Sequence, residues 1–469
     1  MRTVFARSQM LCGLAVLMVA LAARADGGDD DSNIDNLGES DGAQWRLSPG
    51  SGPSDDRGGD WGDKGRWFTA WSNSISVRLK TSSAAPNYAP DVTNSTVRVL
   101  VRPTIAGSAL RIKLENTLGK SPVVFSAAFV GQAGAGAAIA PGTNLPLSFQ
   151  GQPGITLLPG EGAYSDPLPF PVNPFQRLAV SLNVVSAKEV SAHSLGLATT
   201  YISPGPVGSS ESGAGFTPVN QDAGTFPIYW VAAVDVKSGT AAGTIVTFGD
   251  SITDGRCSTR DPVTGAIYPD QYNRWTDLLA ARLQALYGKR APAIANEGIA
   301  GNRVAAAIGP TNYPGTGPAA LDRLDNDVLS RAGLRWVVFF EGTNDIFGGS
   351  DAATLIAALQ QVIDRVHAKG VPIFGSPIIP RGKTTSAPGW SPAMEAVRLQ
   401  VNHWIRTQAN FDGMIEFPAL MQGPIDAASA SETIWRDYSC FDNTHPNKTG
   451  YQAMGSYVDL GLFKIEQDW

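Results

Sequence analysis

The chain has 469 residues, of which 43% are hydrophobic, and it carries a formal net charge of −6. This acidic balance disfavours binding to nucleic acids or to anionic membranes, so we expect neither partner. The length and the hydrophobic content are sufficient for two domains with substantial cores. Beyond the N-terminus, the sequence has no apolar stretch long enough for a transmembrane helix, so we expect no membrane insertion.

Residues 1–25 have the three parts of a secretory signal peptide. Arg2 and Arg7 supply the charged part, Met10 to Ala23 is apolar, and an Ala-x-Ala cleavage site ends at Ala25. Cleavage there removes three arginines and no acidic residue, which changes the net charge from −6 to −9. We therefore expect a secreted or periplasmic protein, and the sequence does not distinguish between these two locations.

Residues 26–63 are rich in Gly, Ser and Asp and contain few apolar side chains. Such a segment cannot bury enough surface to offset the entropy lost on ordering, so we expect a disordered acidic spacer.

Residues 64–238 have the pattern of an antiparallel β-sandwich, similar to a jelly roll. Short apolar runs alternate with polar residues and are separated by Gly and Pro, and no long helical period occurs. In one run, Leu110, Ile112 and Leu114 share a face that we expect to be buried. Two basic residues, Arg111 and Lys113, share the opposite face.

The role of this β-sandwich stays open. Trp67, Trp71 and Tyr164 fit either a carbohydrate-binding surface or the hydrophobic core, and we favour the core. His193 has no companions at metal-ligand spacing, so we expect an ordinary surface residue.

In residues 241–469, apolar strands alternate with amphipathic helices, which predicts an α/β domain with a parallel, doubly wound, flavodoxin-like sheet. The expected strands are 244–248, 292–295, 335–340, 371–376 and 414–417, and the expected helices are 272–286, 320–329, 352–368, 394–407 and 450–463.

Four polar blocks occur in this part of the chain, each positioned after a strand. They are Gly249-Asp250-Ser251, Asn296 to Asn302, Glu341 to Asp345 and Asp442 to Pro446. A lone Gly-Asp-Ser more often marks a capping serine, but the four blocks in this order resemble the SGNH (GDSL) hydrolase family. The resemblance covers roughly half of the chain and implies the flavodoxin-like fold. Secreted two-domain members of that family often carry a β-sandwich in front.

Acyl transfer needs an activated nucleophile, and Ser251 requires a base to take its proton. Among the four histidines, only His445 follows a strand and lies beside a carboxylate, whereas His367 and His403 lie within expected helices. Asp442 precedes His445 by three residues, so a single turn brings its carboxylate to the imidazole. We therefore expect Ser251, His445 and Asp442 to be the catalytic residues.

The resemblance also implies an oxyanion hole, which would hold the negative charge that develops on the substrate carbonyl oxygen. Its donors would be the backbone N–H groups of Ser251 and Gly301 and the side-chain amide of Asn344. A turn glycine and an Asx-turn are the plainer interpretations of the last two residues. Three neighbouring polar residues are expected to hold the loops by hydrogen bonds: Asp250, Asn302 and Asp345.

Two cysteines remain after cleavage of the signal peptide, Cys257 and Cys440. Because Cys257 follows Ser251 and Cys440 precedes His445, an active site would bring them close together, and we expect a disulfide. Two separate buried thiols are the alternative. No metal-ligand spacing, phosphate loop or dinucleotide fingerprint occurs, so we expect no metal and no cofactor.

These observations favour a secreted serine esterase acting on short acyl esters, such as acetyl groups of small molecules or polysaccharides. A lysophospholipase or a broad arylesterase is one alternative, and a carbohydrate-binding protein on an inactive hydrolase scaffold is another. We expect residues 241–469 to hold every catalytic residue, with the β-sandwich packing against them or aiding binding. The oligomeric state stays open.

Overall fold

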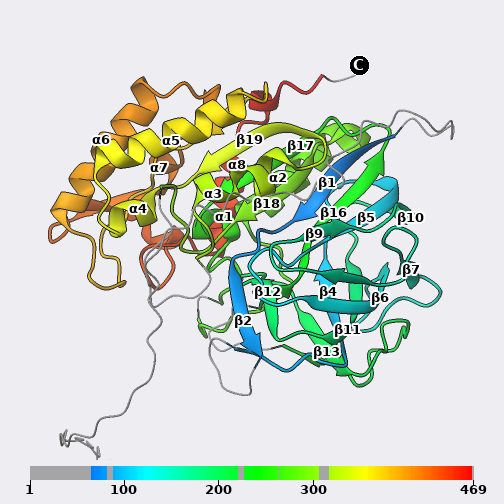
Figure 1. Ribbon diagram of the computed structural model, residues 1–469. Coiled ribbons are helices and arrows are strands. Elements are labelled where there is room, and N and C mark those ends of the chain that lie inside the picture. Colours follow the sequence, from blue (N-terminus) through cyan, green and yellow to red (C-terminus); the bar gives the residue numbers. More distant parts are fainter. Residues whose placement is uncertain (1–64, 82–87, 220–225, 262, 306–315, 467–469) are drawn as a thin grey trace, which may run out of the picture. The chain divides into compact units, whose positions relative to one another are not determined.

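The N-terminal region consists mainly of antiparallel sheets, which lie together in Figure 1. Apolar side chains alternate along their strands, as the sequence pattern predicts. The computed structural model describes residues 65–81, 88–219, 226–261, 263–305 and 316–466. The expected signal peptide and spacer, residues 1–63, lie outside the described residues. Among the described residues, no helix combines the length and the apolar character needed to span a bilayer.

Two large sheets enclose the core of the N-terminal region. The first contains β1 (Arg66–Ser72), β16 (Val231–Ser238), β5 (Gly107–Glu115), β10 (Leu168–Val172) and β9 (Gly162–Tyr164). The second contains β14 (Thr217–Pro218), β13 (Thr200–Pro204), β4 (Ser95–Val101), β11 (Leu178–Ser186), β6 (Val123–Gln132), β7 (Leu145–Leu147) and β8 (Ile155–Leu157). Apolar side chains of both sheets form one cluster, as expected for a sandwich.

A smaller sheet contains the strand that ends at His193. It contains β15 (Ile228–Tyr229), β12 (Glu189–His193), β2 (Val77–Thr81) and β3 (Tyr88–Ala89). Its strands pair antiparallel except for β2 and β3, which are parallel.

The predicted inner face of β5 is confirmed, because Leu110, Ile112 and Leu114 are fully buried. The opposite face meets the following part of the chain, since Lys113 donates a hydrogen bond to Asn326 at 3.2 Å. On the same face, the Arg111 guanidinium pairs with Asp235 and lies over the rings of Trp67 and Tyr164. These two aromatic rings therefore pack around an ion pair in which Asp235 is buried and Arg111 is partly exposed.

The predicted parallel sheet is confirmed, and its strand order is that of flavodoxin-like folds. In spatial order it contains β18 (Ala293–Gly298), β17 (Thr244–Gly249), β19 (Leu334–Phe340), β20 (Ile373–Gly375) and β21 (Gly413–Met414). Strand β17 lies between β18 and β19, and it is buried along its whole length. Alternate residues of the sheet point into two separate hydrophobic clusters, one on each face.

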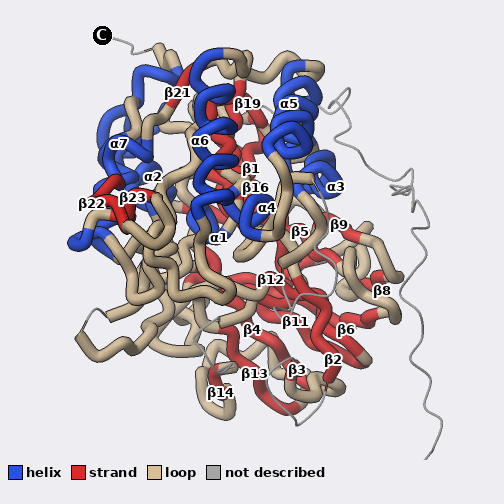
Figure 2. Tube along the Cα trace, turned by 90° about the vertical axis from the view of Figure 1, so that its left-hand side faces the viewer, coloured by secondary structure: helices blue, strands red, loops and turns tan. Residues whose placement is uncertain are grey.

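Helices cover both faces of this sheet, and Figure 2 shows the described helices gathered around its strands. The cluster on one face includes side chains of α3 (Ala320–Leu324), α5 (Ala352–His367) and α6 (Pro392–Thr407). The cluster on the other face includes α2 (Trp275–Tyr287), α7 (Phe417–Met421) and α8 (Lys448–Tyr457). Local signals fix the helix starts: the side chains of Asp351, Ser391 and Asn447 cap α5, α6 and α8.

Several expected boundaries were wrong. The helix expected at 320–329 changes into a π-helical turn at Asp325–Leu329, and the last helix ends at Tyr457. The carboxylate of Asp459 caps a separate 3₁₀ turn, Leu460–Phe463. The strand expected at 414–417 ends early because Phe417 and Pro418 begin α7, where proline is favoured. A hairpin of β22 (Gln422–Asp426) and β23 (Ser431–Ile434) was not predicted.

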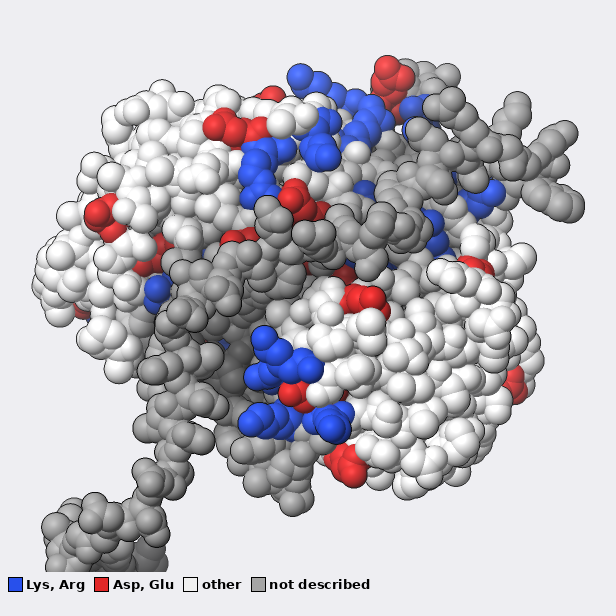
Figure 3. Space-filling model, viewed as in Figure 1, with Lys and Arg blue, Asp and Glu red and all other residues white. Residues whose placement is uncertain are grey.

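The surface carries charges of both signs. On the face shown in Figure 3, small groups of basic and acidic side chains are scattered over a mostly uncharged surface. This mixture agrees with the modest net charge of the chain.

Candidate active site

Ser251 lies at the carboxyl end of β17, where the chain turns into α1 (Ser251–Asp254), a single helical turn. The Asp250 carboxylate caps this turn by accepting a hydrogen bond from the Ile252 N–H at 2.9 Å. A Cβ at position 249 would lie 2.3 Å from the carbonyl oxygen of Phe340, so only glycine fits there. Strand pairing and capping therefore fix the direction in which Ser251 leaves the sheet.

A chain of short hydrogen bonds joins Ser251, His445 and Asp442, all of which are buried. The distance from Ser251 Oγ to His445 Nε2 is 2.7 Å, and that from His445 Nδ1 to Asp442 Oδ2 is also 2.7 Å. The second carboxylate oxygen of Asp442 accepts the backbone N–H groups of Thr444 and His445. Because Nδ1 faces a carboxylate, it carries the proton, which leaves Nε2 free to accept the serine hydroxyl.

The electrostatics of the site favour an ionised Asp442 and a neutral His445. Burial works against ionisation of Asp442, but the hydrogen bond and charge of His445 and two backbone N–H groups outweigh it, so its pKa lies well below the usual range. Burial lowers the pKa of His445, despite its bond to Asp442, and the charges of Arg256 and Arg381 lower it further. An imidazole in this state has the protonation needed in a base.

Gly301 and Asn344 follow the two strands that flank β17. Gly301 comes after β18 with a φ of +79°, a conformation that favours glycine, and a Cβ there would lie 2.8 Å from Thr316 Cγ2. Asn344 lies in α4 (Thr343–Phe347), which follows β19, and its side-chain amide donates to the carbonyl of Asn302 at 2.9 Å. The structure thus links Asn344 to the loop that contains Gly301.

The three polar residues expected to hold the loops do form hydrogen bonds there. Besides Asp250, the carboxylate of Asp345 accepts the N–H groups of Val304 and Ala305 at 3.0–3.1 Å. The side-chain amide of Asn302 donates to the carbonyls of Thr316 and Pro318, both at 2.7 Å.

The block order and this geometry agree with a sequence comparison. Residues 247–453 match the sequence model of the GDSL-like Lipase/Acylhydrolase family, a range that contains Ser251, Gly301, Asn344, Asp442 and His445. This part of the chain is a GDSL-like acylhydrolase domain. It is a carboxylic ester hydrolase domain, and an antiparallel-sheet region precedes it.

Several solved structures of hydrolases are similar to part of the chain. The acetylxylan esterase Axe2 from Geobacillus stearothermophilus is 18% identical, with 48% of this chain and 96% of that chain covered and a TM-score of 0.34. Est24, a carbohydrate acetylesterase from Sinorhizobium meliloti, is 16% identical, with coverage of 45% and 94% and a TM-score of 0.34. A GDSL-like lipase from Bacteroides thetaiotaomicron is 15% identical, with coverage of 48% and 89% and a TM-score of 0.32. No curated protein matches the chain in sequence.

A disulfide joins Cys257 to Cys440 within the GDSL domain, with a Cα–Cα distance of 6.4 Å. It connects the loop after α1 to the loop that carries Asp442 and His445. Asp442 and the two cysteines place three potential metal-ligand atoms within 4.8 Å of one another. Both sulfur atoms are bonded to each other, however, which leaves them unsuited to bind a metal as thiolates.

Two residues near the site escaped the sequence reasoning. Arg381 is buried, donates to Thr343 Oγ1 and lies over the rings of Phe347 and Trp390. Burial lowers its pKa to about 10, although the charges of Asp250 and Asp442 act in the opposite direction. No local pattern in the sequence distinguishes it from the other arginines.

The second is His193, and the expectation of an ordinary surface residue was wrong. Its side chain is 2% exposed, and it contacts the end of α1 from the N-terminal region. The contact joins residues 61 positions apart, which no local spacing reveals.

Proposed function

We propose that the chain hydrolyses carboxylic esters with Ser251 as the nucleophile, His445 as the general base and Asp442 as the residue that orients His445. The observation that supports this proposal is the continuous pair of 2.7 Å contacts from Ser251 through His445 to Asp442. A serine hydroxyl becomes reactive when a neutral imidazole takes its proton during attack.

In the proposed reaction, Ser251 Oγ bonds to the ester carbonyl carbon while its proton passes to His445 Nε2. The carbonyl oxygen becomes an anion, which the backbone N–H groups of Ser251 and Gly301 and the amide of Asn344 stabilise. Collapse of this intermediate releases the alcohol, which takes the proton from His445 and leaves an acyl group on Ser251. Water, deprotonated by His445, then attacks the acyl-enzyme by the same route and releases the acid.

For the substrate, we propose a short acyl ester, such as an acetyl group on a small molecule or a carbohydrate. Ser251 is 4% exposed, which supports a narrow approach to its hydroxyl rather than an open groove. A disulfide beside the site supports a secreted or periplasmic protein, because such bonds persist in oxidising compartments. We also propose residues 64–238 and 241–469 as the two domains of the mature chain.

The test is hydrolysis of para-nitrophenyl esters of increasing acyl length, and of lysophosphatidylcholine, by the mature chain and by Ser251→Ala. We expect turnover of the acetyl ester to exceed that of the octanoyl ester and to be lost in the variant. Near-normal turnover by folded Ser251→Ala contradicts the mechanism. Preference for the lysolipid identifies a lysophospholipase instead, and polysaccharide binding without ester cleavage identifies an inactive scaffold.

A further inference from the structure

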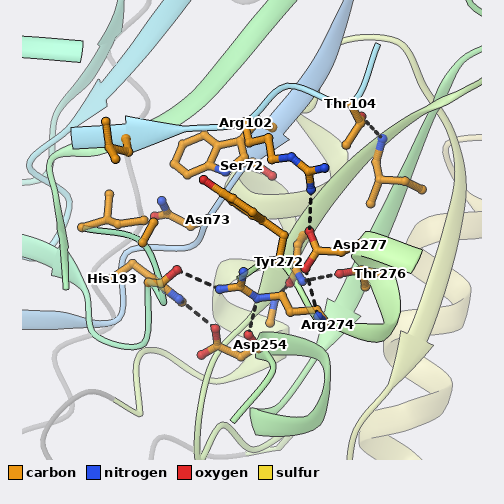
Figure 4. A pocket seen from close by; sticks show the side chains of 18 residues that line it. Ser72, Asn73, Arg102, Thr104, His193, Asp254, Tyr272, Arg274, Thr276 and Asp277 are labelled. Carbon is orange, nitrogen blue, oxygen red and sulfur yellow. Dashed lines mark hydrogen bonds and ion pairs between the residues drawn. The ribbon is translucent and has the colours of Figure 1, made fainter. Parts of the chain in front are cut away.

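The N-terminal region contacts the GDSL domain directly behind Ser251, through His193 at the end of β12. In Figure 4, the His193 side chain points toward Asp254, the last residue of α1. His193 Nε2 lies 2.9 Å from Asp254 Oδ1, and its Nδ1 lies 2.7 Å from the carbonyl oxygen of Ser74. The histidine and Asp254 are each 2% exposed, so water does not weaken their contact.

Asp254 connects this contact to the proposed oxyanion hole. Its second carboxylate oxygen accepts the backbone N–H of Ala300 at 2.8 Å, and Ala300 directly precedes Gly301. The carbonyl of Asp254 accepts a hydrogen bond from Arg274 Nε. Asp254 therefore holds the loop of Gly301 against the helical turn that begins at Ser251.

The chemistry of the partners makes the His193 contact a strong one. The carbonyl of Ser74 can only accept, so Nδ1 must donate to it, and Nε2 faces a carboxylate oxygen. A second proton must therefore lie between His193 and Asp254, which makes the contact charge-assisted. Although burial acts to lower the pKa of His193 and Arg274 opposes a positive charge, Asp254 and the Ser74 carbonyl raise it above the usual value.

Ser74, which follows β1, connects the N-terminal region to the site by a second route. Ser74 Oγ accepts a hydrogen bond from Arg323 Nη1 and donates one to Glu297. Arg323 in turn donates to the carbonyl of Gly249, two residues before Ser251, and to the side chain of Asn302, directly after Gly301. Ser74 and His193 thus connect, through Arg323 and Asp254 respectively, to residues that adjoin Ser251 and Gly301 in the chain.

We infer that His193 is a positioning residue for ester hydrolysis, which sets the Gly301 N–H relative to Ser251 through Asp254. The N-terminal region then completes the oxyanion hole instead of only packing against the GDSL domain. This inference rests on the proposed function, because it assigns a role to Gly301 in that reaction.

The experiment compares the full mature chain with His193→Ala and His193→Gln. Loss of the imidazole leaves Asp254 Oδ1 without its histidine partner and loosens the carboxylate that holds the Ala300 N–H. Small displacements of reacting groups reduce rates by about 100-fold. We expect His193→Ala to lower kcat by about 10- to 100-fold with KM changed less than about threefold. Glutamine carries an amide nitrogen near the place of Nε2, so His193→Gln should recover part of kcat.

Thr104→Val is a matched control for loss of a contact between the two regions. Thr104 Oγ1 accepts the Ile294 N–H at 3.0 Å, near the opposite end of β18 from Gly301. We expect this variant to lose thermal stability while keeping kcat within about twofold, because it leaves Asp254 untouched. A similar fall in kcat for both variants means a general stability effect and overturns the positioning role.

Hydrogen exchange of the Ala300 N–H provides a measurement that does not depend on activity. We expect exchange at least about tenfold faster in His193→Ala, with partial recovery in His193→Gln. If kcat and exchange both stay at the wild-type level in folded His193→Ala, the inference is wrong while the proposed function stands. If Ser251→Ala keeps its turnover, the proposed function fails, and the exchange result still decides whether His193 holds the loop.

Discussion

Two buried histidine–aspartate pairs, one at the junction of the N-terminal region with the GDSL domain and one within that domain, differ in their second partner. His193 is held by Asp254 and by a carbonyl oxygen, both of which accept hydrogen bonds. His445 is held by Asp442 and by the hydroxyl of Ser251, which can donate. Burial acts on both rings in the same direction, yet the pKa is raised in His193 and lowered in His445. For His193, the Asp254 carboxylate and the Ser74 carbonyl outweigh burial, whereas for His445 the charges of Arg256 and Arg381 add to burial. These surroundings favour a charged His193 and a neutral His445 that can accept a proton.

The largest expected difference between the two pairs comes from replacing His445. We expect His445→Ala to lower kcat by about 10⁴-fold or more, because Ser251 then has no base, while His193→Ala lowers it by only about 10- to 100-fold. Steady-state kinetics on the two folded variants measure the difference. Equal losses would mean that the two pairs do not have separate roles.

Asn344→Ala tests the proposed oxyanion donor that follows β19. Loss of one oxyanion donor costs about 10²–10³-fold in kcat with little change in KM. Kinetics with para-nitrophenyl acetate provide the measurement, and alanine at Ser350, a half-buried residue that follows α4, supplies a nearby control. A change confined to KM would assign Asn344 to binding of the ground-state substrate.

Reduction of Cys257–Cys440 tests how far the His445 loop depends on its covalent link to the Ser251 loop. The bridge closes a loop with a sequence separation of 183, for which the chain-entropy model gives about 5 kcal/mol of stability. Because it joins the loops bearing the base and the nucleophile, we expect activity to fall at lower reductant concentration than ellipticity. Alkylation followed by mass spectrometry of the unreduced chain must show no free thiol. Coincident loss of activity and fold would indicate that the bridge acts only on global stability.

The two histidines should differ in the direction of their pKa shifts, and the pH dependence of activity should report the shift of His445. His445 must be neutral to act as a base, and its lowered pKa keeps it neutral at more acidic pH. The acid limb of kcat/KM should therefore have its midpoint below about pH 6.5, the usual histidine value. A midpoint above that value contradicts the environment described for His445.

His193 should affect stability in the opposite sense. Its pKa is raised in the folded state, so its contribution is fully present below about pH 6.5 and is lost as the pH rises through the folded-state pKa. The difference in Tm between wild type and His193→Gln should therefore shrink from pH 6 to alkaline pH. A constant difference would mean that the pair does not titrate in this range.

Local patterns were enough to predict an antiparallel β region, a parallel sheet and the polar blocks that follow its strands. The alternation around Leu110 and the apolar run of β19 each report burial within a few residues. Ser251, Gly301 and Asn344 could be placed because parallel strands end at one edge of a sheet. The chain order of these motifs was therefore sufficient to bring them together.

What escaped prediction depends on contacts between distant segments. Nothing near His193 in sequence indicates that it contacts Asp254, and Lys113 has the pattern of an exposed residue although it faces Asn326. The short hairpin of β22 and β23 lacks a long alternating run, and Arg381 resembles any loop arginine until its burial is seen. Polar side chains buried between two regions give no periodic signal in the sequence. Each of them has the pattern of an exposed residue within its own region.

The distance along the chain between Ser251 and His445 has a consequence for the order in which the enzyme is completed. The two residues are 194 positions apart, and the proposed base is the later of the two in the chain. A ribosome that has made everything up to residue 440 has released the serine, its helical turn and both flanking strands, but no base. Premature termination or C-terminal proteolysis therefore yields fragments that carry the nucleophile without its activator. Synthesis beyond His445 is therefore required before the proposed ester cleavage can begin.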